Sequence, residues 1–360
     1  MRILIFRTAA LGDFVMTVPA IKKVREIFTD SEIILLTSPT TDAKQIVKVS
    51  SYTGGKSNLP WVDLVIPHLI DRVIAFELRD FVSLYRRLRY EKFDLIIVMD
   101  DIGVTRFSII KKVIFLFFLT GRTKIIGWRD NFISGGNPFK KKMNGSLKHH
   151  VYGPLQFLRD LNPYYLISDK DVSFDLRPKD ISLDWVSHYF LQNDLLNQKV
   201  IAIAPGSIQP HKQWPKQNYL DLVWKLIEYS QDVRIILIGI KSDLEVCEEI
   251  CLLEPQKIIN LAGVLNINQL AGLFTKCSLV VGNDGGSMHL SDAMGCSVVS
   301  IVSGIEFENS IEPWNNKMNV IRNKVSCSPC YNFLSCSKGD NICVTNIRVD
   351  VVFEKCVELL

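Results

Sequence analysis

Asp13 is the first residue of the chain whose type and place suit chemistry. It follows a strand-like apolar run and Gly12, and it lies at the start of a segment with helical apolar spacing. Backbone N–H groups at a helix start favour negative charge, so a carboxylate there would stay ionised. We expect Asp13 to be a general base at a strand end; the plainer interpretation is that it only caps the helix.

A second segment, residues 204–215, also joins a strand to a helix. Gly206 and Ser207 permit a close approach of backbone to a ligand. Lys212 offers a compact cation for a phosphate group. Ser207 and Lys212 are therefore candidate substrate-binding residues, although an ordinary loop with a solvated lysine would have the same pattern.

A third segment, residues 280–290, runs from a buried strand through two glycines into a helix. Such a turn presents backbone N–H groups and a helix N-terminus to an anion. Asp284 would repel a phosphate held against it, so it suits sugar hydroxyls beside the phosphate. His289 could face the same ligand or be structural. The candidate substrate-binding residues here are Asp284, Gly285, Gly286, Ser287 and His289.

Strand-like and helix-like segments alternate along nearly the whole chain, which predicts an α/β fold of parallel sheets covered on both faces. The expected strands are 2–7, 32–38, 73–77, 94–100, 124–128, 200–205, 233–239, 258–261, 278–283 and 298–303. The expected helices are 14–28, 81–89, 105–119, 218–229, 244–253, 267–276 and 287–294.

A polar stretch at residues 168–178 predicts a boundary between two domains, 1–175 and 176–360. A chain of 360 residues is too long for one ordinary core. Each domain should be one doubly wound sheet that binds ligand beyond the carboxyl ends of its strands. We expect the two sheets to face a common cleft.

The composition restricts the compartment and the partners. The net charge of +4 is too small to argue for nucleic acid, so we expect no nucleic-acid partner. The first apolar run is too short for a signal peptide. The most lipid-like segment, residues 113–119, is too short to span a bilayer. These features predict a soluble, cytoplasmic protein and leave association with a membrane surface open.

Basic residues gather between residues 122 and 150, in a stretch that is also rich in Gly and Asn. The usual interpretation is a solvated loop. The alternative is a docking surface for an anionic substrate or an acidic membrane face, with aromatic side chains that could reach into it. The basic members are Arg122, Lys124, Arg129, Lys140, Lys141, Lys142, Lys148, His149 and His150, and the aromatic ones are Trp128, Phe132 and Phe139.

Four of the nine cysteines form the pattern C-x₂-C-x₅-C-x₆-C near the C-terminus. Thiolates this close together resemble a small structural Zn or Fe site; unligated thiols or redox pairing would also fit. The four are Cys327, Cys330, Cys336 and Cys343. Asp100 and Asp101 lack the D-x-D spacing of a metal site, so we expect them to be structural or on the substrate side of the first domain.

The three strand–loop–helix segments, in this order and spacing, resemble glycosyltransferase family 9, the ADP-heptose:lipopolysaccharide heptosyltransferases. The resemblance rests on Leu11-Gly12-Asp13, on Pro205-Gly206-Ser207 with Lys212-x-Trp214-Pro215, and on the run from Asn283 to Leu290. It implies a GT-B fold with an N-terminal acceptor domain and a C-terminal nucleotide-sugar domain.

The family resemblance also implies a mechanism: transfer with inversion and without a catalytic metal or other cofactor. The donor would be a nucleotide-diphospho-sugar of the ADP-heptose type and the acceptor an anionic glycolipid such as the lipopolysaccharide core. Asp13 would be the general base, Lys212 would contact the donor phosphates, and residues 284–289 would bind the donor's sugar and diphosphate. An acidic residue after Gly239 would also contact the donor, with Asp243 and Glu245 both in place for it.

The resemblance leaves alternatives within and beyond the enzyme class. Many members of the family have threonine where this chain has Gly285, which removes one possible donor to phosphate. The same fold could carry another donor sugar or a protein acceptor. Outside the enzymes, the alternative is a non-catalytic protein that binds a sugar nucleotide. The presence of Asp13, Lys212 and Asp284 together argues against it.

Overall fold

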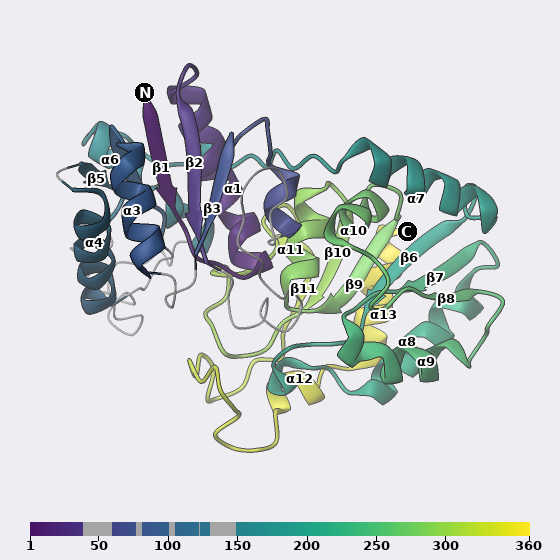
Figure 1. Ribbon diagram of the computed structural model, residues 1–360. Helices are drawn as coiled ribbons and strands as arrows, with labels where there is room; N and C mark the ends of the chain where they lie inside the picture. Colours follow the sequence, from purple (N-terminus) through teal and green to yellow (C-terminus); the bar gives the residue numbers. More distant parts are fainter. Residues whose placement is uncertain (39–59, 77–80, 101–104, 122, 130–148) are drawn as a thin grey trace. The chain divides into compact units, whose positions relative to one another are not determined.

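The computed structural model describes residues 1–38, 60–76, 81–100, 105–121, 123–129 and 149–360 (Figure 1). The chain divides into two compact units, Met1–Arg177 and Pro178–Leu360. The division falls two residues after the boundary expected from the polar stretch. Each unit has its own parallel sheet with helices on both faces, which confirms the α/β fold of two doubly wound sheets.

The first unit contains a five-stranded parallel sheet in the order β3-β2-β1-β4-β5. Its strands are β1 (Arg2–Phe6), β2 (Glu32–Thr37), β3 (Arg72–Ala75), β4 (Leu95–Val98) and β5 (Lys124–Ile126). Successive side chains of a strand point to opposite faces. Leu4, Ile34 and Ile96, which are register partners, therefore share the face that packs against α3 (Phe81–Glu91) and α4 (Arg106–Thr120).

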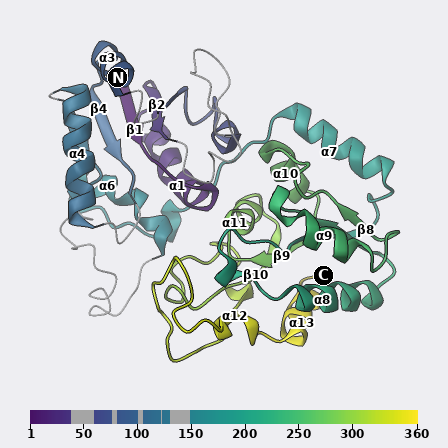
Figure 2. The same cartoon turned by 60° about the horizontal axis from the view of Figure 1, so that its bottom comes forward.

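The other face of this sheet is covered by α1 (Leu11–Ile27), as Figure 2 shows. The short helix α6 (Phe157–Leu161) follows two 3₁₀ turns in the same unit. The expected helix at 14–28 and the structure's α1 differ at the start, because Leu11 and Gly12 already belong to the first turn.

The second unit contains a six-stranded parallel sheet in the order β11-β10-β9-β6-β7-β8. Its strands are β6 (Lys199–Ala204), β7 (Val233–Leu237), β8 (Ile258–Asn260), β9 (Leu279–Asn283), β10 (Ser297–Ile301) and β11 (Val320–Ile321). One face packs against α8 (Lys216–Tyr229), α9 (Leu244–Cys251) and α13 (Val349–Leu359) through a large apolar cluster. On the other face lie α7 (Asp180–Gln192), α10 (Ile267–Phe274) and α11 (Gly286–Ala293) (Figure 1).

Two long helices were not expected from the sequence. In α7 the buried Ser182, Val186 and Phe190 recur every four residues, and in α13 the buried Val352 and Cys356 do the same. The helical periodicity of buried positions was therefore present, but exposed apolar side chains such as Ile181 dilute it, and the first buried position of α7 is a serine. The structure also adds the short α12 (Ile342–Thr345) and β11. Among the described residues, no helix is long and apolar enough to cross a membrane.

Candidate functional site

Asn283 joins the two loops that follow β6 and β9 in the second unit. Its Nδ2 donates hydrogen bonds to the carbonyls of Pro205 (2.9 Å) and Gly206 (3.0 Å), and its Oδ1 accepts one from the backbone N–H of Trp214 (2.9 Å). Trp214 is fully buried and donates its indole N–H to Ile347. The backbone around Ser207 and Lys212 is therefore fixed against the end of β9.

The sequence-predicted Lys212, Asp284 and His289 come together at this point. Lys212 Nζ donates to Asp284 Oδ2 at 2.9 Å, and His289 Nε2 lies 3.9 Å from Asp284 Oδ1. Burial raises the pKa of the Asp284 carboxyl, but the charge of Lys212, with smaller effects of His289 and Arg322, brings that pKa below its ordinary value. Asp284 is thus held ionised beside a cation, in a place almost closed to solvent.

The start of α11 lies directly after Asp284. Gly285 is the N-cap residue of α11 and has no side chain that could accept a hydrogen bond. The cap therefore provides no side-chain acceptor for the amides of the first turn. The close packing beneath this turn requires Gly282: a Cβ there would come within 2.7 Å of the Ala204 carbonyl oxygen and 3.1 Å of the Met288 side chain. Such a helix start can bind an anionic group.

Asp243 occupies a hollow that two glycines create at the ends of β6 and β7. A Cβ on Gly206 would lie 2.2 Å from the carboxyl carbon of Asp243, and one on Gly239 would lie 2.6 Å from its Oδ2. The same carboxylate accepts a hydrogen bond from the backbone N–H of Ile240 (2.8 Å). Glu245 is exposed on the first turn of α9. Of the two acidic candidates, only Asp243 lies next to the Ser207 loop.

Ser207 uses its hydroxyl within its own loop. The Oγ donates to the carbonyl of Gln209 (3.1 Å) and accepts from the backbone N–H of that residue (3.3 Å). Its hydroxyl therefore shapes the turn. The role of Ser207 in substrate binding stays a prediction.

In the first unit, Asp13 lies in the first turn of α1, close to the carboxyl end of β1. Arg7 continues that strand and is buried; its guanidinium donates to the carbonyls of Met99 (3.0 Å) and Asp13 (3.2 Å). The hydroxyl of Thr17 also donates to the Asp13 carbonyl (2.7 Å). The backbone of Asp13 is thus clamped. Arg7 was not expected as a site residue, although an arginine ending an apolar strand was a visible signal.

The structure bears on two sequence expectations in this unit: it agrees with a structural role for Asp100, and it differs from the exposed position expected for His149. Asp100 is buried and forms an ion pair with Lys112 of α4, which accounts for its charge without a metal. His149, expected in an exposed basic loop, is 4% exposed and accepts a hydrogen bond from the Val151 amide. It is a turn-capping residue, since its side chain accepts this hydrogen bond at the start of the 3₁₀ turn His150–Tyr152. Asp101, Arg122, Phe132, Phe139, Lys140, Lys141, Lys142 and Lys148 lie outside the described residues.

The four C-terminal cysteines are half-buried and share one segment. Backbone amides that follow Cys336 lower the pKa of its thiol, whereas burial and then the other three thiols raise that of Cys343. Four thiolates are a donor set for Zn or Fe. Throughout the described parts of the chain, however, no group of three or more His, Cys, Asp or Glu side chains is placed to hold one ion. The metal site stays a prediction from spacing.

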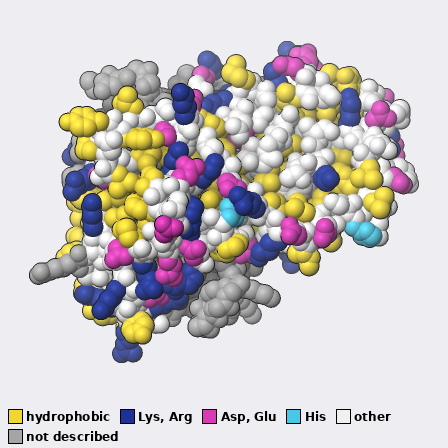
Figure 3. Space-filling model, turned by 90° about the horizontal axis from the view of Figure 1, so that it is seen from above, with side chains coloured by type: hydrophobic (Ala, Val, Ile, Leu, Met, Phe, Trp, Pro, Cys, Tyr) yellow, Lys and Arg dark blue, Asp and Glu magenta, His cyan; other side chains and the backbone are white. Residues whose placement is uncertain are grey.

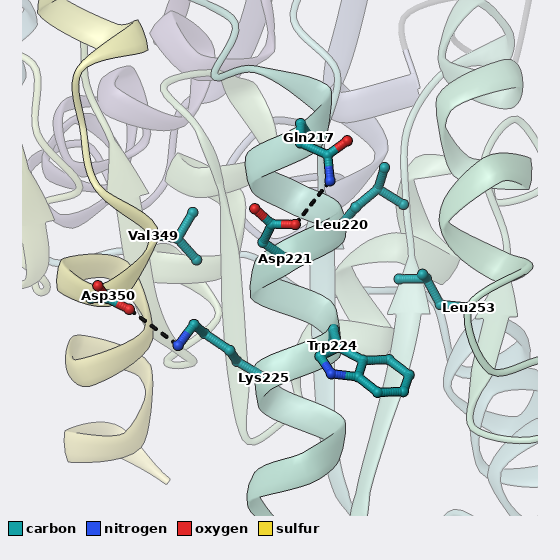
Figure 4. Close-up of a pocket in the computed structure, with 8 residues that line it drawn as sticks. All are labelled: Gln217, Leu220, Asp221, Trp224, Lys225, Leu253, Val349 and Asp350. Carbon is teal, nitrogen blue, oxygen red and sulfur yellow. Dashed lines mark hydrogen bonds and ion pairs between the residues drawn. The ribbon is translucent and has the colours of Figure 1, made fainter.

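A hollow in the second unit lies away from these residues, between α8 and α13 (Figure 4). Two of its polar pairs bind each other: Lys225 with Asp350 (3.1 Å) and Gln217 with Asp221 (2.9 Å). No sequence-predicted site residue lines it, so it is not the candidate site. Its lining residues are Gln217, Leu220, Asp221, Trp224, Lys225, Leu253, Val349 and Asp350.

Known proteins resemble this chain over its full length. It is 24% identical over 369 aligned positions to lipooligosaccharide heptosyltransferase 2 of Campylobacter jejuni, covering 100% of this chain and 98% of that protein. Its fold matches the Escherichia coli ADP-heptose LPS heptosyltransferase II with a TM-score of 0.70 at 19% identity, covering 100% and 98% of the two chains.

A further fold match is the iron-containing dodecameric glycosyltransferase TibC of enterotoxigenic E. coli (TM-score 0.56, 15% identity), which covers 99% of this chain and 75% of that one. The model of glycosyltransferase family 9 (heptosyltransferase) matches residues 81–339, more than half of the chain. The loops that carry Lys212 and Asp284 lie inside that match. The chain therefore belongs to glycosyltransferase family 9 and is a glycosyltransferase.

Proposed function

We propose that this enzyme transfers heptose from a nucleotide-diphospho-heptose of the ADP-heptose type to the lipopolysaccharide core or a related anionic envelope glycolipid. The transfer inverts the anomeric centre and uses no catalytic metal. Family membership and the names of its relatives support the sugar and the acceptor class. All nine cysteines are free, as suits a reducing compartment, so we place the reaction in the cytoplasm.

The donor side of the proposal is carried by one observation: the Lys212–Asp284 pair lies directly before the N-terminus of α11. A leaving diphosphate gains negative charge as the glycosidic bond breaks. The Lys212 ammonium and the amides of Gly286 and Ser287 would stabilise that charge without a divalent ion. Asp284, held ionised, would accept hydrogen bonds from sugar hydroxyls, and His289 would border the same group.

Asp243 is the further donor contact that we favour over Glu245. Its carboxylate lies against Gly206, in the loop that also carries Ser207 and Lys212. Ionised carboxylates accept strong hydrogen bonds from hydroxyl groups. The ribose and sugar hydroxyls of a nucleotide sugar are the donors that fit such an acceptor.

Asp13 would act on the acceptor. Its carboxylate takes the proton of the acceptor hydroxyl while that oxygen bonds to the anomeric carbon. The bond from that carbon to the diphosphate breaks at the same time, and the nucleoside diphosphate leaves with the electron pair. The clamp of Arg7 and Thr17 on the Asp13 backbone would hold the base in position.

Replacement of the base tests the reaction. Asp13→Asn in the purified enzyme should lower turnover by about 10²–10⁴, the usual contribution of general base catalysis. Binding of nucleoside diphosphate should be unchanged, because the donor contacts lie in the other unit. Activity should persist when divalent ions are omitted.

Asp30→Asn is the matched control, because Asp30 lies beyond the far end of α1; it should leave turnover unchanged. Near-normal turnover of Asp13→Asn would remove this residue from the mechanism. If the wild-type protein is folded but transfers heptose to no lipopolysaccharide-type acceptor, the proposed function is wrong.

A further inference from the structure

The helix α4 is apolar on two opposite sides. Its inner side buries Ile109, Leu116 and Leu119, and the two leucines belong to the apolar cluster of the first sheet. Its outer side exposes five large apolar side chains, each with between 41% and 67% of its surface in solvent. They recur at intervals of three and four residues, so they form one stripe along the helix. The stripe consists of Phe107, Ile110, Ile114, Phe117 and Phe118.

The neighbouring helix α3 continues this surface. The ring centres of Tyr85 in α3 and Phe118 in α4 lie 5.2 Å apart, so the two helices are in contact there. Val82 and Tyr90 of α3 are exposed. Figures 1 and 2 both show α3 and α4 next to each other in the first unit. Contiguous exposed apolar patches on a folded chain mark sites of association with a protein or a membrane.

Basic side chains border the apolar stripe. Arg106 and Lys111 lie on its two sides within α4, and the Lys111 ammonium lies 4.1 Å from the centre of the Phe107 ring. Exposed Arg86 and Arg89 lie on α3. At the left of Figure 3, the visible face of the first unit shows hydrophobic side chains among lysines and arginines, and acidic side chains are also present there.

Acidic residues are scarce on the same helices. The sequence of α4 contains no Asp or Glu. The acidic residue of α3 is Glu91, which forms ion pairs with Arg72 and Arg87. The surface therefore carries net positive charge around an apolar centre.

We propose that the outer face of α3 and α4 docks on a membrane that contains anionic lipid. An interfacial helix buries its apolar side chains at the boundary of headgroups and acyl chains, and its Lys and Arg side chains meet the phosphates. The positive border matches an anionic lipid surface. This inference goes beyond the proposed sugar transfer, and its main readout, vesicle binding, is measured without donor or acceptor.

The test is co-sedimentation of the full chain with vesicles of phosphatidylcholine alone and of phosphatidylcholine mixed with phosphatidylglycerol. The wild type should bind the anionic vesicles, more weakly as salt is raised, and hardly bind the neutral ones. Phe117→Ser with Ile114→Asn should reduce the bound fraction at least tenfold. Lys111→Glu should reduce it on anionic vesicles as well.

Matched controls lie in the second unit. Ile181→Asn with Leu191→Ser removes apolar side chains of α7 that are 77% and 60% exposed, and Lys276→Glu reverses an exposed charge. Both should leave vesicle binding intact. Transfer to a water-soluble acceptor should be unchanged in every one of these variants, so a failure of docking is distinguishable from a failure of the proposed function.

Two results would overturn the proposal. One is binding to anionic vesicles that the α4 variants do not weaken. The other is that the wild type binds no vesicles and runs as a dimer in size-exclusion chromatography, while Phe117→Ser with Ile114→Asn runs as a monomer. The face would then be an interface between two copies of the chain.

Discussion

At the scale of single residues, Lys212 and Asp284 depend on each other. Their side chains are 15% and 6% exposed, and the ion pair between them is 2.9 Å long. Removal of one partner from a buried pair leaves an uncompensated charge and costs about 3–5 kcal/mol. Lys212→Met should therefore lower the free energy of unfolding by about this amount near neutral pH, and Lys212→Met with Asp284→Asn by less.

The pH dependence of this effect follows from the pKa of Asp284. In the wild type that pKa is below its ordinary value, so the ionised carboxylate contributes stability above the ordinary pKa and loses it as pH falls through the folded value. In Lys212→Met, burial would dominate and raise the pKa. The loss of unfolding free energy caused by Lys212→Met should then become smaller as pH falls from roughly 7 to 5, because Asp284 takes up a proton. Urea unfolding at both pH values checks this; a constant loss would contradict it.

Asp243 and Glu245 form a matched pair for a second prediction at this scale. Asp243→Asn should raise the KM for the nucleotide sugar by roughly tenfold to a hundredfold, the value of one hydrogen bond to a charged group. Glu245→Gln should leave KM unchanged because Glu245 is exposed on α9. Steady-state kinetics of both variants decides. Equal effects would remove Asp243 from the donor site.

At the scale of elements, the segment of residues 327–343 contains little regular structure and lies against Gly304, whose carbonyl accepts from the Cys330 amide (3.2 Å). A short segment of this kind gains order from a metal, because binding energy then contributes to folding. We expect about one Zn or Fe per chain in protein purified without oxygen.

Cys330→Ser should lower both metal content and melting temperature, while the folded fraction still transfers sugar. Cys251→Ser is the control, since Cys251 is a half-buried thiol outside the segment. If elemental analysis finds no metal and all four thiols can be titrated in the native protein, the metal site is ruled out. Cys327, Cys330, Cys336 and Cys343 are then ordinary cysteines.

At the scale of the whole molecule, the two units have separate sheets and separate cores. A nucleoside diphosphate that binds beside α11 should stabilise the second unit, by about 2.7 kcal/mol at a concentration one hundred times its Kd. Hydrogen exchange should slow in residues 205–214 and 283–290 and stay unchanged in residues 1–37. Protection confined to the first unit would contradict the assignment of the donor to residues 178–360.

The sequence alone determined the parallel sheets, because buried strands are continuous apolar runs and helices repeat their apolar residues about every four positions. It also located the loops of Asp13, Lys212 and Asp284, since polar residues and glycines directly follow three of those strands. It missed α7 and α13, in which exposed apolar residues such as Ile181 obscure the buried stripe.

Only the tertiary structure decided which residues meet. Lys212 and Asp284 are 72 positions apart and form an ion pair because β6 and β9 are neighbours in the sheet. Asp243 is favoured over Glu245 because two glycines at adjacent strand ends leave room for its carboxylate. The exposed and the buried apolar side chains of α4 alternate within the same stretch of sequence. Contacts between distant segments and the side of a helix that faces solvent depend on the packing of the whole chain, and no local pattern contains that information.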